Sequence, residues 1–410
     1  MCSRLFQSSF SLLPILLLAV LPAMTGAEAQ IRITKPAGEK ISIHLGGLTA
    51  DGDEASRLFM QTLQGNLNRS GWFTVTRAGQ AEVSVLGSVQ RRRDQLRVEG
   101  RVMGGADRRQ YMSNSYRHSA DDARRLAHRM ADDIVQAVTG HKGIASTRIV
   151  MVGVRDNAKE LFISDADGGN FRQLTRDGNI SVRPRWGPDG DQLTYTAYLR
   201  RFPDVFLVEL STGNRRAVAN YSGLNAGGVI SPDGQDLAVI LSKDGNPELY
   251  VKNLRSGRLT RLTHTPRANE GSPSWSPDGR EIVYVSDQAG RPQLYIISRE
   301  GGSPRRITSR GTANVAPDWG PNGLIAFSSR VEGQYRIAIM DPQTERVRYL
   351  DVPDRADYED PSWAPNGRHI VCGRREQFRS SIYVLDTMGD PPLRLTREGG
   401  DYYSPAWSPE

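Results

Sequence analysis

Six copies of one short phrase run through the C-terminal two-thirds of the chain at nearly constant spacing. In its fullest form, at Trp275–Gly279, the phrase reads Trp-Ser-Pro-Asp-Gly. The prolines of the six copies are 44, 45, 44, 44 and 44 residues apart: Pro188, Pro232, Pro277, Pro321, Pro365 and Pro409. A repeat of this length is typical of the four-stranded blade of a WD40-like β-propeller. Within the phrase, the aromatic residue ends a buried strand, Pro fixes φ, and Asp-Gly or Asn-Gly makes a tight turn.

The remainder of each repeat also has the pattern of strands. After the turn at 277–279, apolar segments follow at 281–286 and 293–298, and a Gly-rich turn at 300–302 leads to an Arg-Ile-Thr phrase at 306–308. Apolar residues alternate between Gly, Pro and Asp clusters, and no helical period intervenes. Each repeat is therefore predicted to form four strands.

The two ends of the repeat array complement each other. Residues 148–175 contain three predicted strands but no Trp-Ser-Pro strand before them, whereas residues 404–409 supply such a strand with no blade after it. We therefore expect the C-terminal strand to pair into the first blade and close a six-bladed ring. Closure leaves only short, protected sheet edges.

The chain begins with the pattern of a secretory signal peptide. Arg4 precedes an apolar stretch at 12–23, and Ala27-Glu28-Ala29 fits a cleavage site. The stretch is too short to span a membrane as a helix. Cleavage after Ala29 would leave Cys372 as the one cysteine of an exported protein, and its place in an apolar segment favours a buried, unreactive thiol.

Residues 30–143 lack the repeat and are predicted to form a separate α/β domain. One helix is expected from Asp51 or Asp53 to Arg69, and a second from Ser119 to Gly140. Strands are expected near 40–45, 81–89, 95–103 and 110–117, which gives the order β-α-β-β-β-α. The predicted fold is thus a small N-terminal α/β domain followed by a six-bladed all-β propeller over 144–410.

The loops that lead into the innermost strands form a candidate protein-binding surface. In a propeller these loops surround one mouth of the central channel, and here they are rich in amides and carry two tyrosines that we expect to be exposed. The candidate residues are Asn179, Arg183, Asn225, Asn269, Glu270, Asn314, Glu359, Tyr402 and Tyr403. We expect Arg183, Glu270 and Tyr402 to contribute to the energy of binding. The alternative is that these are turn residues that only satisfy local backbone groups.

A second candidate site is the start of the mature chain. Ile31 and Ile33 alternate with Arg32 and Thr34 after Gln30. A short terminal segment of this kind can dock onto a partner or add to its sheet as a strand. The alternative is a frayed end without function.

Patterns of catalysis and of metal or nucleotide binding are weak. The chain has no Gly-x-Ser-x-Gly, His-Glu-x-x-His, Cys-x-x-Cys or phosphate-loop motif, and its six histidines lack the spacing of ligand pairs. Asp189, Asp233 and Asp278 occupy the turn position of the repeat. Arg91–Arg93 precede Asp94 at a predicted hairpin tip, which favours a solvated turn over a nucleic-acid site. We therefore expect no cofactor, no metal and no nucleic acid.

Taken together, the chain resembles the TolB family. The resemblance is carried by the signal peptide, the α/β domain, the segment 139–143 before Thr147-Arg148-Ile149, the stretch 286–293, and the propeller that ends in Trp-Ser-Pro. The sequence departs from the family pattern at 41–47, at Ile230 where a Trp is usual, and in the loop 224–228, which lacks a His that some relatives have.

The resemblance implies a non-catalytic periplasmic adaptor of the Tol-Pal system. The family binds the lipoprotein Pal on one propeller face and the C-terminal domain of TolA through the mature N-terminus. It supports outer-membrane invagination in cell division and envelope integrity, and in some species colicins exploit the Pal-binding face. By this resemblance we expect a monomer that reaches the membrane only through its partners.

Two other functions stay open from the residues alone. An exported propeller enzyme, such as a carbohydrate lyase or hydrolase, would need His and carboxylate side chains clustered on one face. A peptidase's propeller domain would need a catalytic domain after it. Fold alone does not decide between them, since propellers carry many functions.

Overall fold

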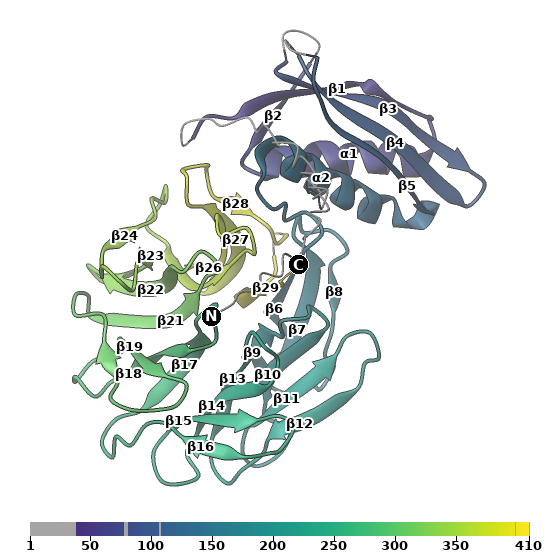
Figure 1. The fold of residues 1–410 in the computed structure, drawn as a ribbon. Helices are drawn as coiled ribbons and strands as arrows, with labels where there is room; N and C mark the ends of the chain where they lie inside the picture. Colours follow the sequence, from purple (N-terminus) through teal and green to yellow (C-terminus); the bar gives the residue numbers. More distant parts are fainter. Residues whose placement is uncertain (1–37, 78–80, 106–107, 398, 410) are drawn as a thin grey trace, which may run out of the picture. The chain divides into compact units, whose positions relative to one another are not determined.

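The structure is a computed structural model that describes residues 38–77, 81–105, 108–397 and 399–409. It contains a small α/β domain followed by a six-bladed β-propeller, as the sequence predicted (Figure 1). In the described part of the chain, no helix has both the length and the apolar character needed to cross a membrane.

The α/β domain is one five-stranded sheet with two helices. The strand order is β2-β1-β3-β4-β5, with β1 parallel to β2 and β3 and the other pairs antiparallel. Its elements are β1 (Ile41–Ala50), α1 (Glu54–Arg69), β2 (Phe73–Thr76), β3 (Val83–Arg92), β4 (Gln95–Gly104), β5 (Gln110–Ser119), the 3₁₀ helix η1 (Ala120–Asp122) and α2 (Ala123–Thr139). The apolar faces of both helices are buried, with Phe59 and Met130 fully covered.

The helix ends largely agree with the sequence prediction, which needs two corrections in this domain. Asp53 is the N-cap of α1 and accepts the N–H groups of Ala55 and Ser56, and Gly140 ends α2 in the left-handed conformation. Ser119, however, caps the short η1 rather than α2. The predicted strand order also missed β2, an edge strand of four residues that is too short to show a period.

The propeller consists of six four-stranded sheets. The innermost strands are β9 (Ser181–Trp186), β13 (Asn225–Ile230), β17 (Glu270–Trp275), β21 (Ala313–Trp319), β25 (Asp357–Trp363) and β29 (Tyr402–Trp407). The second strands are β6 (Arg148–Arg155), β10 (Gln192–Ala197), β14 (Asp236–Leu241), β18 (Glu281–Ser286), β22 (Ile325–Val331) and β26 (His369–Glu376). The third strands are β7 (Ala158–Asp165), β11 (Asp204–Glu209), β15 (Glu248–Asn253), β19 (Gln293–Ser298), β23 (Gln334–Met340) and β27 (Arg379–Asp386). The outer strands are β8 (Arg172–Gln173), β12 (Arg215–Ala219), β16 (Leu259–Arg261), β20 (Arg305–Arg306), β24 (Val347–Tyr349) and β28 (Leu393–Arg394).

The ring is closed by the C-terminal strand, which confirms the prediction. In the first blade the strand order is β29-β6-β7-β8, so the last strand of the chain pairs with the first strand of the propeller. Two hydrogen bonds continue the closure beyond the strands: Ser408 N–H donates to the Arg148 carbonyl at 2.8 Å, and the Trp407 indole donates to Thr147 Oγ1 at 2.7 Å.

The repeated phrase forms the same turn in successive blades. The Ser276 hydroxyl donates to Asp278 Oδ1 at 2.7 Å and accepts the Glu281 N–H at 2.9 Å, and Gly279 has φ of 70°. The Trp275 indole donates to the Val229 carbonyl of the preceding blade at 3.0 Å. The phrase thus builds a turn and also joins neighbouring blades. Cys372 is a buried free thiol, as expected.

Candidate protein-binding surface

The strand directions define two faces of the propeller. Each innermost strand starts on one face and ends in the Trp-x-Pro turn on the other. We call the first the loop face: it consists of the loops that lead into the innermost strands and the hairpins that join second to third strands. We call the second the turn face. All nine residues predicted to bind a partner belong to the loop-face ends of the innermost strands or their loops.

A backbone irregularity recurs in each innermost strand near the loop face. In each case the residue three positions before the last residue of the innermost strand has positive φ. The pairing register with the second strand shifts at this point. These residues are Arg183, Gly227, Ser272, Ala316, Asp360 and Ser404. Only one is glycine, so five carry the strain of a left-handed side-chain-bearing residue, of order 1 kcal/mol each.

This irregularity places side chains from different blades in contact. Arg183 Nη1 donates to Ser272 Oγ at 2.9 Å, which joins strands β9 and β17 past the intervening β13. Ser404 Oγ donates to Asp360 Oδ2 at 2.5 Å. The predicted residue Arg183 therefore lies at the rim of the channel, exposed and held by one hydrogen bond.

Three of the predicted residues are buried. Asn225 donates to the Pro203, Tyr221 and Gly223 carbonyls, and Asn314 donates to Gln293 Oε1 and to the Arg310 carbonyl. The carboxylate of the third, Glu270, accepts hydrogen bonds from Thr265 and Ser286, each 2.9 Å long. In this structure the three side chains hold the loops in shape, so any part they have in binding is indirect.

Burial also changes the chemistry of Glu270. The loss of solvent around the carboxyl group raises its pKa to about 7, and the neighbouring Glu248 acts in the same direction. The Thr265 hydroxyl lies between the two carboxylates, 3.2 Å from Glu248 Oε2. At neutral pH the Glu270 carboxyl group therefore keeps its proton more readily than an exposed glutamate does.

The other predicted loop-face residues reach the surface to different extents. Asn179 and Asn269 are exposed, and Asn269 donates to Asp287 at 3.2 Å. Glu359 is half-buried and pairs with Arg375 at 3.1 Å. The two tyrosines, expected to be exposed, are half-buried: Tyr402 packs edge-on against Phe162 and Phe171, and Tyr403 lies beneath the Lys159 ammonium.

The most exposed aromatic residue of the described chain was not predicted from the sequence. Phe378 lies at the tip of the β26–β27 hairpin and is 97% exposed. Four further exposed apolar residues lie on the loop face: Val154, Ile180, Tyr198 and Phe202. All five belong to three consecutive blades, those that contain β25, β29 and β9. Phe378 could have been noticed as an aromatic between Gln377 and Arg379 in a hairpin turn.

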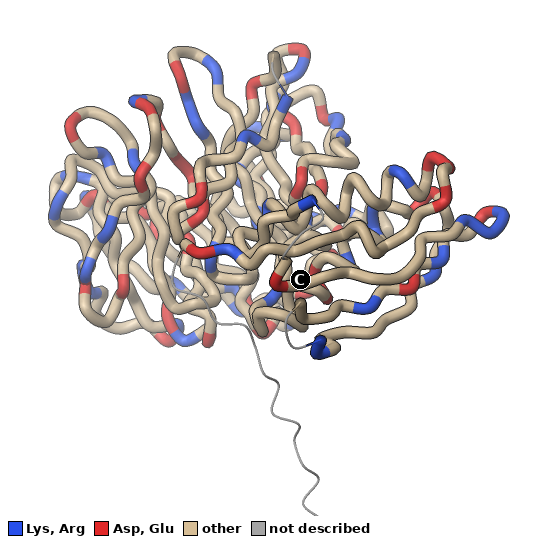
Figure 2. Tube along the Cα trace, turned by 90° about the horizontal axis from the view of Figure 1, so that it is seen from above, with Lys and Arg blue, Asp and Glu red and all other residues tan. Residues whose placement is uncertain are grey.

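The opposite half of the loop face is polar. The corresponding hairpins at 242–247, 287–292 and 332–333 consist mainly of charged, amide and Gly residues. In the portion of these hairpins that the structure describes, no large apolar side chain is exposed. Figure 2 shows basic and acidic residues interspersed along the chain rather than gathered in a patch of one sign. This mixed character suits a protein partner better than a nucleic acid.

One group of side chains has the ligand atoms of a metal site. Ligand atoms of His128, Asp165 and Asp167 lie within 4.8 Å of one another. Arg124 already donates to both oxygens of Asp167, at 2.5 and 2.6 Å, and lies 3.4 Å from Asp165. Asn66 hydrogen bonds the second ring nitrogen of His128. With a cation already paired to these carboxylates, the group is better described as an ion-pair network.

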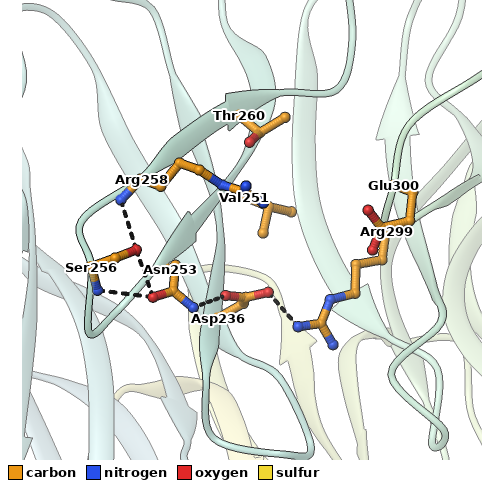
Figure 3. Close-up of a pocket in the computed structure, with 8 residues that line it drawn as sticks. All are labelled: Asp236, Val251, Asn253, Ser256, Arg258, Thr260, Arg299 and Glu300. Carbon is orange, nitrogen blue, oxygen red and sulfur yellow. Dashed lines mark hydrogen bonds and ion pairs between the residues drawn. The ribbon is translucent and has the colours of Figure 1, made fainter.

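A polar groove of about 540 Å³ lies at the turn face, between the blades of β15 and β19. Figure 3 shows Asp236 between Asn253 and Arg299, with hydrogen bonds of 2.8 and 2.6 Å. The remaining charges, Arg258 and Glu300, have opposite sign. Because the Asp236 carboxylate is fully engaged within the protein, this groove has little capacity left for a ligand.

Comparisons with known proteins decide the family. A family model described as the TolB beta propeller domain matches residues 135–410. The chain belongs to the TolB family. The Tol-Pal system protein TolB of Gluconobacter oxydans (strain 621H) is 35% identical over 328 residues, which cover 77% of this chain and 71% of the relative. The protein of the same name from Ruthia magnifica subsp. Calyptogena magnifica is 28% identical over 417 residues, covering 96% and 98%.

A solved TolB structure supports the whole architecture. The crystal structure of TolB from Acinetobacter baumannii aligns with a TM-score of 0.80 at 26% identity, over 91% of this chain and 97% of that one. The resemblance and the two-domain fold predicted from the sequence are thereby confirmed. The second predicted binding site is the N-terminal segment expected to bind TolA. Its residues lie outside the described part of the chain: Gln30, Ile31, Arg32, Ile33 and Thr34.

Proposed function

We propose that this protein is a non-catalytic periplasmic adaptor of the Tol-Pal system that binds Pal through the loop face. Family membership supports the proposal, and so does the loop face itself. Its apolar side chains lie on three consecutive blades and its other half is polar. Exposed aromatic anchors beside polar, rigid loops are characteristic of protein-binding surfaces.

The proposal includes export and a second partner. The signal peptide would be removed after Ala29 and deliver the protein to the periplasm. The mature segment that begins at Gln30 would bind the C-terminal domain of TolA. With Pal and TolA bound at different sites, the protein would link the outer-membrane side to the inner-membrane side during cell division.

Titration of the Pal periplasmic domain from the same organism tests the proposal. Mature protein, residues 30–410, and a truncation, residues 40–410, are titrated in parallel by calorimetry. We expect saturable binding by both, because the loop face is intact in each. The absence of binding by either would remove the proposed function and favour an exported propeller enzyme.

Two matched variants locate the site. Phe378→Ser removes the exposed aromatic of the loop face, and we expect Pal affinity to fall at least about tenfold. Tyr349→Ser removes a 43% exposed aromatic from the outer strand β24 and should leave affinity unchanged. Because neither side chain is buried, both variants should melt like the wild type. Equal affinities of the two variants would contradict the placement.

A further inference from the structure

The central channel widens into a cavity at its turn-face mouth. A cavity of about 340 Å³ is lined there by the phrase's Pro from all six repeats, by its Trp from five of them, and by Ile230 from the other. Two charged side chains also line it, Arg185 from β9 and Asp318 from β21. These strands belong to blades three steps apart in the ring of six, so the two residues lie on opposite walls.

The equivalent positions in the other repeats show what the fold requires there. They are uncharged: Val229, Ser274, Ser362 and Ala406. Ser274 Oγ accepts the backbone N–H of Trp319 at 3.0 Å. In the same way, Asp318 Oδ2 accepts the backbone N–H of Trp363, in the next blade, at 2.7 Å. A hydroxyl therefore suffices for this bond between blades. The carboxylate of Asp318 adds a negative charge that the bond does not need.

The Arg185 charge is poorly compensated within the protein, whereas the Asp318 carboxylate accepts hydrogen bonds from the Trp363 backbone N–H and from the Ser362 hydroxyl. Among the residues that the structure describes, the Arg185 side chain has a single hydrogen bond, 3.5 Å long, to the Pro184 carbonyl of its own strand, and no ion pair joins it to Asp318. Charges in apolar surroundings are costly unless they are paired. Burial accordingly raises the pKa of Asp318, and the Arg185 charge opposes this rise.

Trp363 lines the same cavity. Trp363 is 5% exposed, and its indole N–H, which is itself buried, has no hydrogen-bond partner among the described residues. The corresponding indoles of Trp186 and Trp275 donate to carbonyls of the preceding blade, both at 3.0 Å.

We propose that this cavity binds a small zwitterion of the amino-acid class. Its carboxylate would lie on the Arg185 guanidinium, its ammonium on the Asp318 carboxylate, and its apolar body against the Trp and Pro walls. Charge-assisted hydrogen bonds to each end would select a zwitterion over a molecule with one charge. The inference is independent of the proposed function, because the loop face is not involved.

Calorimetric titration of the mature protein with L-phenylalanine tests the proposal. Two analogues lack one charge each, 3-phenylpropanoate without the ammonium and 2-phenylethylamine without the carboxylate. We expect saturable binding of phenylalanine with Kd of about 1 mM or below, and at least about tenfold weaker binding of each analogue. No saturation by about 10 mM phenylalanine, or equal binding of an analogue, would overturn the proposal.

Three variants provide the structural control. Arg185→Gln removes the cation, and Asp318→Ser removes the anion while it keeps an acceptor for the Trp363 N–H, as Ser274 does for Trp319. Each should weaken phenylalanine binding at least about tenfold. Arg258→Gln removes a cation from the groove of Figure 3 and should have no effect. If the first two variants bound phenylalanine like the wild type, the assignment would be wrong.

Discussion

The two faces of the propeller differ in how closely the six repeats resemble one another. At the turn face the proline of the phrase recurs in all six repeats, and in two of them Ser231 and Ser276 each donate to an Asp two residues later and accept a backbone N–H five residues later. At the loop face the buried anchors differ from blade to blade, as Asn225, Glu270 and Asn314 show. Repetition therefore accompanies the structural role, and variation accompanies the surface we propose for partner binding.

The strongest test of this comparison removes the strand on which both faces depend. Deletion of residues 402–410 takes away β29, leaves the inner edge of β6 unpaired and exposes the core around Ala406 and Trp407. We expect the propeller to lose its cooperative thermal transition, because a ring opened at one blade exposes apolar surface at both sides of the gap. Circular dichroism and calorimetric melting measure it, with the 40–410 truncation as the control. A melting temperature equal to that of the wild type would contradict closure by β29.

A paired substitution tests whether the turn face joins blades. Trp275 is buried and donates to the Val229 carbonyl of the preceding blade, whereas the half-buried Trp319 donates to Gly323 of its own turn. Trp275→Phe should therefore lower the free energy of unfolding by about 2–3 kcal/mol, and Trp319→Phe by about 1 kcal/mol, because water can replace the second bond. Guanidinium unfolding measures both. Equal losses would mean that the bond between blades adds nothing.

A third test concerns the pH dependence of a loop-face anchor. The pKa of Glu270 is raised to about 7 by burial, above its value in an unfolded chain, so the folded state favours the protonated form. Stability from this group is thus fully present below about pH 4 and is lost as pH rises through about 7. Glu270→Gln supplies the kind of amide that Asn225 and Asn314 carry. Between about pH 5 and pH 8 this variant should lose less unfolding free energy than the wild type loses, and the difference should be roughly 1–3 kcal/mol.

Urea unfolding at the two pH values measures this difference. Glu332→Gln, at the exposed tip of the β22–β23 hairpin, serves as the control and should follow the wild type. Parallel pH dependence of the wild type and Glu270→Gln would show that the Glu270 carboxyl group titrates as it does in the unfolded chain.

The difference between the turn face and the loop face also explains what could be predicted from the sequence. The turn at Trp275–Gly279 and the closure by residues 404–409 depend on local chemistry and on spacing, and both were predicted. The burial of Glu270 was not, because it results from Thr265, Ser286 and Glu248, which pack around it only in the folded blade. The exposure of Phe378 likewise depends on where a hairpin tip ends relative to its neighbours.

The smallest expected effect tests how redundantly the turn face is held. Ser276→Ala removes the hydroxyl that bonds Asp278 and the Glu281 N–H, which should cost about 1 kcal/mol and lower the melting temperature by about 2–4 °C. The loss is limited because the equivalent residues Gly187, Gly320 and Ala364 have no hydroxyl, yet their turns form with glycines of positive φ. Differential scanning calorimetry measures it. A loss above about 3 kcal/mol would mean that this turn depends on its serine, unlike the turns at Gly187, Gly320 and Ala364. The turns of the turn face would then differ in stability although their sequences are similar.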